Sequence, residues 1–576
     1  MNNFFNRLDI RAIPLDLQLL HPLYRRCRPR ILIVTDGNLS YRQNQGFGLW
    51  RFIHAITHHA GVTNKPILTL AHRGAHTATV TVETDTYTVK TGYNFATANP
   101  SVNRTNYDQI WLFGFSTNGG INDSEVEAIT DFMNAGGGVF ATGDHGALGN
   151  ALCGRLPRIR HMREWTDIPM GLEGDAEVAV NRIDTVVDPG ANNRYEFSDQ
   201  SDDIPQRIYP NYTVTNGAAG WEARIHSLLR MPGEPTVRLQ ASGNTNFTND
   251  IDVHPDHPHE SVCYNVHDNS TLTGNYTEAN YNFEEFQPAV VDSSRRIKAN
   301  IIAYGVSGGR AINTSIGNKP PVTPQMFGVV SVYNGRAAQR YSGQSQRPGR
   351  IVCNSTWHHF VNINLDGIGT SRNGLGSWSG GSPNSGDFTP SADLEKIYVH
   401  FRNMVNWLQP SNKIWCRLWW LAATARFHPQ LVEELVEVPK FKTWRDFVAI
   451  GGEFSNVLAQ EIGDGAAQEL VYDLLLSEES TEQFADLFND EKSISASVDS
   501  KEFVYGIMGK LISRMAYLLD YEDAKGMEEV FKTGIEKHVD QLREDVKEAL
   551  VMGVRENESR ARATQQVIKR MTELVG

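Results

Sequence analysis

The first 150 residues of this chain alternate between short apolar runs and longer amphipathic stretches. The apolar runs are rich in β-branched residues and cover 31–35, 66–70, 109–114 and 138–142. Continuous runs of this kind are typical of strands that are buried on both faces, and strands that alternate with helices form parallel sheets. The sequence therefore predicts an α/β domain built on a doubly wound, mostly parallel sheet.

A chain of 576 residues is too long for one typical core. Residues 411–576 hold 20 Lys and Arg against 30 Asp and Glu, which accounts for −10 of the formal charge of −13. This acidic part is poor in proline and reads as helical. We expect an N-terminal extension (1–28), an α/β domain (29–409) with a large loop-rich insertion over about 165–300, and an acidic α-helical domain (410–576).

Local signals refine this outline. Ser124 and Glu127 have the spacing of a capping box at the start of a helix. Within and after the insertion we expect a helix over 293–307 and strands over 327–333 and 350–356.

Charge and cysteine usage exclude several classes of protein. The net charge of −13 argues against a general nucleic-acid binder, although Arg155, Arg158, Arg160 and Arg163 are one candidate for a local basic groove. The five cysteines form no CxxC pair, which fits a reducing compartment. Neither a signal-peptide core nor an apolar run of membrane-spanning length is found, so we expect a cytoplasmic protein with no membrane partner.

The strongest candidate site is Gly143-Asp144-His145-Gly146. This segment follows the strand at 138–142, and the loops at the carboxyl edge of an open α/β sheet hold its ligands. A histidine beside a carboxylate suits general acid–base chemistry or the binding of a divalent metal ion. The alternative is a tight turn whose aspartate caps the next helix.

Two further candidates lie at predicted strand ends. Asp36 follows the strand at 31–35 and could act as a ligand or base, or simply form a turn with Gly37. His358 and His359 follow the strand at 350–356. Adjacent residues of an extended chain point to opposite faces, so we expect one of the two to share a site with His145, and we favour His358. The expected metal ligands are Asp144, His145 and His358.

A histidine-rich segment over 252–260, with His267 and Asp268 nearby, is a second candidate metal site. Its prolines make it extended, and it has no standard ligand spacing. A solvated loop over the main site explains it equally well.

The order of these parts over about 29–160 resembles the class I glutamine amidotransferase-like superfamily, in particular its trehalose-utilisation-protein-like branch. The similarity rests on residues 31–36, 107–112 and 136–140, and on a late strand that leads to His358 and His359. The family implies a flavodoxin-like sheet with its site after the strand at 138–142. In the amidotransferases this turn carries a nucleophilic cysteine, whereas here Asp144 and His145 take its place and Cys153 lies further along. This departure argues against glutaminase chemistry through a thiol ester.

Two main hypotheses remain, and a nucleic-acid enzyme, whose arginines at 155–163 would have to open onto the same cleft, is a minor third that the acidic balance argues against. The first is a hydrolase for a small polar substrate, whose residues Asp36, Asp144, His145 and His358 or His359 activate water directly or through a divalent metal ion. The second is a non-catalytic ligand-sensing or assembly protein, in which residues 410–576 bind a protein partner or form a homo-oligomer.

Overall fold

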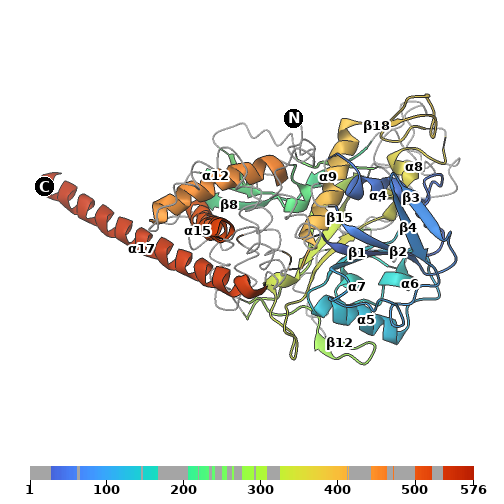
Figure 1. The fold of residues 1–576 in the computed structure, drawn as a ribbon, viewed down its shortest axis with the longest axis horizontal. Helices are drawn as coiled ribbons and strands as arrows, with labels where there is room; N and C mark the ends of the chain where they lie inside the picture. The colour runs from blue at the N-terminus through green and yellow to red at the C-terminus, as the bar shows by residue number, and fades with distance from the viewer. Residues whose placement is uncertain are drawn as a thin grey trace.

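The computed structural model describes a large part of the chain (Figure 1): residues 28–60, 62, 65–144, 147–165, 205–217, 220–231, 237–240, 250–255, 262–264, 275–290, 293–307, 325–370, 372–410, 413, 443–462, 471, 500–521 and 536–575. One sheet of eleven strands dominates it, in the order β11-β7-β14-β15-β16-β6-β5-β1-β2-β4-β3.

The centre of this sheet is parallel and its margins are antiparallel. Strands β16 to β4 in the sheet order pair in parallel, and their bounds are β1 (Arg30–Thr35), β2 (Ile67–His72), β4 (Asp85–Lys90), β5 (Gln109–Phe113), β6 (Gly138–Thr142) and β16 (Arg350–Asn354). The antiparallel strands are β3 (Thr79–Val82), β7 (Gln206–Pro210), β11 (Val253–His254), β14 (Asn300–Ser307) and β15 (Gln325–Asn334). The predicted α/β class is confirmed.

Helices cover both faces of the parallel strands. Ile31 and Ile33 of β1 belong to a core shared with α4 (Trp50–Thr57) and α9 (Ala392–Trp407). Leu32 and Val34, on the opposite face, belong to a second core, which is shared with α5 (Asp123–Asn134), α6 (Asn150–Cys153) and α7 (Ile159–Met162). Burial on both faces explains why these strands are continuously apolar.

The shorter elements follow the chain around this frame. They are β8 (Thr213–Gly217), β9 (Gly220–Arg224), η1 (Ser227–Leu229), β10 (Val237–Gln240), β12 (Asn275–Tyr276), β13 (Phe283–Glu284), η2 (Gly335–Ala337), η3 (Trp357–His359), α8 (Asn362–Leu365), β17 (Gly376–Trp378) and β18 (Phe388–Pro390).

Two local predictions are wrong. The capping box of α5 is formed by Asn122 and Glu125: the Asn122 side chain accepts from the Glu125 amide at 3.0 Å, and Glu125 Oε2 accepts from the Asn122 amide at 3.1 Å. The expected helix over 293–307 is instead a turn followed by β14. Pairing with β15 and β7 buries the run around Ile301, and such pairing overrides a weak local helix preference.

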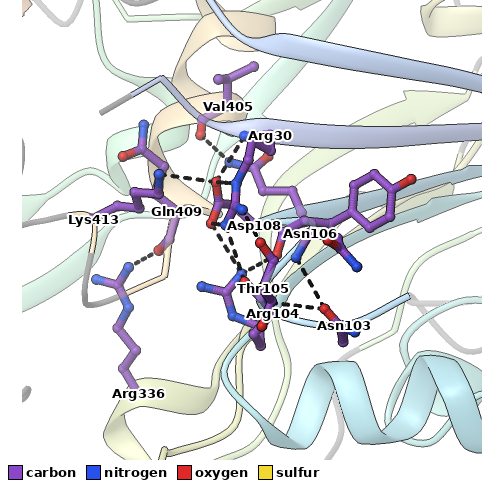
Figure 2. A network of polar contacts seen from close by, with 12 residues as sticks. Arg30, Asn103, Arg104, Thr105, Asn106, Asp108, Arg336, Val405, Gln409 and Lys413 are labelled. Carbon is purple, nitrogen blue, oxygen red and sulfur yellow. Dashed lines mark hydrogen bonds and ion pairs between the residues drawn. The ribbon is translucent and has the colours of Figure 1, made fainter. Parts of the chain in front are cut away.

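A polar network holds the amino edge of the sheet (Figure 2). Asp108, just before β5, is buried and contacts three cations. Both of its carboxylate oxygens accept from Arg30. The Arg104 guanidinium lies 3.3 Å and the Lys413 ammonium 3.5 Å from the same carboxylate. Arg336 donates to the carbonyl of Gln409 in the segment that follows α9. Burial raises the pKa of the Asp108 carboxyl, but its bonds to Arg30, Lys413 and Arg104 outweigh this and hold the pKa below its usual value. The network thus ties the sheet to the start of the C-terminal region.

The predicted helical character beyond residue 410 is confirmed by α12 (Trp444–Ile462), α15 (Ser500–Tyr521) and α17 (Glu536–Val575). Glycines allow α12 and α15 to touch: a Cβ on Gly451 would lie 1.8 Å from the Tyr505 carbonyl oxygen, and one on Gly509 1.8 Å from that of Phe447. In the described part of the chain, none of the helices combines the length and the apolarity that crossing a membrane requires.

Candidate active site

The predicted site residues follow strands that end in one row. Thr35 of β1 pairs with Phe113 of β5, Phe113 with Thr142 of β6, and Thr142 with Asn354 of β16. The loops after these four strands therefore meet at the same carboxyl edge. The order of the strands reverses at β1, since β2 lies on one side of it and β5 on the other. Ligands of open α/β sheets bind at such a switch point.

A histidine, a carboxylate and an amide form a line at this edge. The His358 Nε2 atom lies 3.6 Å from Asp144 Oδ2, and His358 Nδ1 lies 2.8 Å from Asn364 Oδ1 in α8. All three side chains are buried. Because the Asn364 amide oxygen can only accept a hydrogen bond, His358 Nδ1 carries the proton and donates to this oxygen. In the neutral imidazole, Nε2 then presents its lone pair on the side of Asp144.

Thr356 and Arg163 fix the two loops that carry this pair. The Thr356 hydroxyl donates to Asp144 Oδ1 at 3.0 Å and accepts from the His358 amide at 3.0 Å. The buried Arg163 guanidinium donates to the carbonyls of Asp144 (2.8 Å) and Ser355 (2.9 Å), one from each loop. These contacts hold the carboxylate and the imidazole at a set distance.

Aromatic rings line one side of the pair. The Trp357 indole stacks on the His358 ring with centroids 4.1 Å apart, and Phe47 meets His358 edge-on at 5.8 Å. Phe115, from the loop after β5, packs on Trp357 at 5.5 Å. Phe47 and Phe115 are half-buried. The imidazole is thus held in an apolar wall, which strengthens its interaction with a nearby charge.

Asp36 lies at the same edge but is engaged with the backbone. Its Oδ1 atom accepts from the amides of Phe115 and Ser116. Burial raises the pKa of its carboxyl, although these hydrogen bonds and His72 act in the opposite direction. The contacts assign Asp36 a part in holding the loop after β5, and its expected catalytic role stays a prediction.

His359 belongs to a different cluster. Its Nδ1 atom lies 2.7 Å from Asn354 Oδ1, and its ring is parallel to that of His254 with centroids 4.6 Å apart. His254 in turn meets His400 of α9 at 4.8 Å. Of the adjacent histidines 358 and 359, the former contacts Asp144 and the latter packs among these buried rings.

This cluster makes stability depend on pH. Burial lowers the pKa of His400 to about 4 and that of His254 well below its usual value. Between pH 6.5 and pH 4 the unfolded chain therefore binds protons at these residues that the folded chain does not. We expect the free energy of unfolding to decrease as the pH is lowered through this range, by about 1.4 kcal/mol per pH unit for each histidine.

Urea unfolding at pH 7.0 and 5.5, with the wild type and His254→Phe, measures this effect. Neither ring nitrogen of His254 has a hydrogen-bond partner within the described ranges, so a phenylalanine ring can replace the imidazole. The variant should lose less stability than the wild type on acidification. Equal losses of stability in the two proteins would contradict a lowered pKa of His254 in the folded state.

Several predicted residues lie outside the described residues. These are His145, residues 256–260, and His267 with Asp268. Within the described ranges, no three His, Cys, Asp or Glu side chains are placed to share one metal ion. Of the expected metal ligands, Asp144 and His358 are described and lie side by side, so a metal site there stays a prediction.

The four arginines of the local basic cluster are engaged with the protein itself. Arg158 and Arg163 are buried, and Arg155 and Arg160 form ion pairs with Glu278 and other acidic residues. Their contacts are those of structural residues.

Sequence reasoning missed Asn364 and Arg163 as parts of the site. Asn364 lies six residues after His358, and a short helix must fold back for the two to meet. In the sequence, Arg163 stands out only as one of four arginines in a basic cluster. The polar residues 354–356 before His358 are the sequence signal that could have found Thr356, whose hydroxyl donates to Asp144. No protein-family model, curated protein or solved structure matches this chain.

Proposed function

We propose that the carboxyl edge of the sheet is the active site of a hydrolase for a small polar substrate, and that His358 is its general base. The observation that carries the proposal is the line Asn364–His358–Asp144. A base that is oriented by a third group through its other nitrogen is the usual arrangement for proton transfer in hydrolysis. As Nε2 takes a proton from water, the Asp144 carboxylate stabilises the imidazolium that forms.

The strand arrangement also supports a relationship to the amidotransferase-like superfamily. The loops after β1, β5, β6 and β16 occupy the edge where the family resemblance places its site. Cys153 is buried, and burial raises the pKa of its thiol well above the usual value. A protonated, buried thiol is a poor nucleophile, so the proposed chemistry runs through His358 and Asp144.

A divalent metal ion is the alternative means of activating water. Asp144 and His358 would supply two ligands, and a metal between them would lower the pKa of a bound water.

A substrate screen combined with metal analysis tests both forms of the proposal. We expect the wild type to hydrolyse a member of a panel of small esters, amides and glycosides, and Asp144→Asn to lose this activity by about 10²–10⁴-fold. A stoichiometric divalent metal present in the wild type and lost in Asp144→Asn would establish the metal-assisted form. If no panel compound is hydrolysed, but one of them raises the melting temperatures of the wild type and of Asp144→Asn equally, the ligand-sensing hypothesis replaces the hydrolase.

A further inference from the structure

The second half of α17 extends away from the rest of the protein (Figure 1). Near the start of the helix, Leu542, Val546, Ala549 and Leu550 are buried, and α17 packs there on α15. From Ala561 to Leu574 every side chain is exposed. A helical segment of this length is marginal in water without packing.

The exposed segment carries large apolar side chains. Val567 is 56% exposed, Ile568 57%, Met571 61% and Leu574 86%. Their spacings of one, three and three residues put them on one side of the helix. A cluster of this kind on the tip of a helix marks an interaction surface.

Two of these residues, Ile568 and Met571, fall into the residue spacing of a coiled coil. Val554, Ala561 and Ile568 are seven residues apart, and so are Asn557, Thr564 and Met571. The two series alternate at intervals of three and four, which is the spacing of the heptad seam by which two helices pair, and Asn557 and Thr564 are its polar positions. Val567 and Leu574 flank this seam. The outer side is charged and holds Arg555, Glu556, Arg562, Lys569, Arg570 and Glu573.

We propose that residues 554–575 form a parallel coiled coil with the same segment of a second copy of this chain. A heptad seam is complementary to itself, so a second copy fits it without any other partner. The parallel orientation places Ile568 and Met571 against their own counterparts. An antiparallel one would set them against Thr564 and Ala561, which bury less apolar surface. In the parallel register Arg560 lies opposite Gln565, so like charges do not meet.

The oligomeric state of the full chain tests the proposal by size-exclusion chromatography with light scattering. We expect a dimer for the wild type at tens of micromolar, and a monomer for Ile568→Glu/Met571→Glu. The control Ser559→Glu/Gln566→Glu adds the same charge on the outer side of the helix and should stay dimeric. Circular dichroism checks that all three proteins are folded. A monomeric wild type, or a seam variant that stays dimeric, overturns the proposal.

A cysteine substitution tests the orientation. Met571→Cys should form a disulfide-linked dimer under mild oxidation, because residue 571 faces its counterpart in the parallel pair, whereas the wild type should not. A dimer that fails to cross-link overturns the parallel register. Binding of a monomeric wild type to vesicles of anionic phospholipid would show that the apolar tip contacts lipid, and would also overturn the proposal.

Discussion

His358→Gln should lower the hydrolytic rate by about 10²–10⁴-fold, which is the usual contribution of a general base. Glutamine fills a similar volume and can still bond with Asn364, but it has no lone pair of comparable basicity to offer at the position of Nε2. The loss should therefore lie in kcat, with little change in the melting temperature. Steady-state kinetics on the substrate found in the screen, together with thermal unfolding, measure both quantities.

A matched substitution separates this effect from the general loss of a histidine. His59 follows α4, and its Nε2 atom lies 3.0 Å from Glu395 Oε1 in α9 rather than beside Asp144. His59→Gln should retain nearly full activity. If both variants are equally active, His358 is not the base. If both lose activity together with their thermal transitions, the defect is in folding, and Asn364→Ala then decides: a base that has lost its orienting partner should be slower in a protein that is still folded.

Asp108→Asn should have the largest effect on stability, a loss of about 3–5 kcal/mol in the free energy of unfolding. The substitution removes the buried carboxylate that Arg30, Arg104 and Lys413 share. The three positive charges then repel one another without this negative charge between them. Urea unfolding at pH 7 measures the loss.

An exposed ion pair provides the control. Asp123 pairs with Arg155 at 2.6 Å near the surface, and Asp123→Asn should change stability by no more than about 0.5 kcal/mol, because solvent screens such pairs. The pKa of Asp108 is held low in the folded state, so its contribution is present above the unfolded pKa of about 3.9 and is lost as the pH falls through the folded value. Similar effects of the two substitutions would show that the network adds little.

The strands that carry the site could be predicted from sequence because they are buried on both faces. The central residues of β1, β5, β6 and β16 are apolar and buried, and this pattern belongs to parallel strands at the centre of a sheet. The same pattern was misread at β14, where a short apolar run does not distinguish a strand from a helix and only pairing with β15 decides.

The side chains of the site were harder to predict than its location. The edge of the sheet follows from topology, so Asp144 and His358 could be named in advance. Which of two adjacent histidines meets Asp144 depends on the 3₁₀ turn η3, and the role of Asn364 depends on the return of α8. Such contacts are set by tertiary packing, which leaves no periodic signal in the sequence.

The pairing of β6 with β16 also bears on how the protein is made. The Thr356 hydroxyl and the Asp144 carboxylate are 212 positions apart in the chain, and the strands before them are neighbours in the sheet. At 5–20 residues per second, a ribosome needs roughly 10–40 s to synthesise this interval. Throughout that time the edge of β6 has no partner, and an unpaired apolar strand is a site of aggregation. Dependence on chaperones during synthesis is therefore the expected cost of a site built from such distant segments.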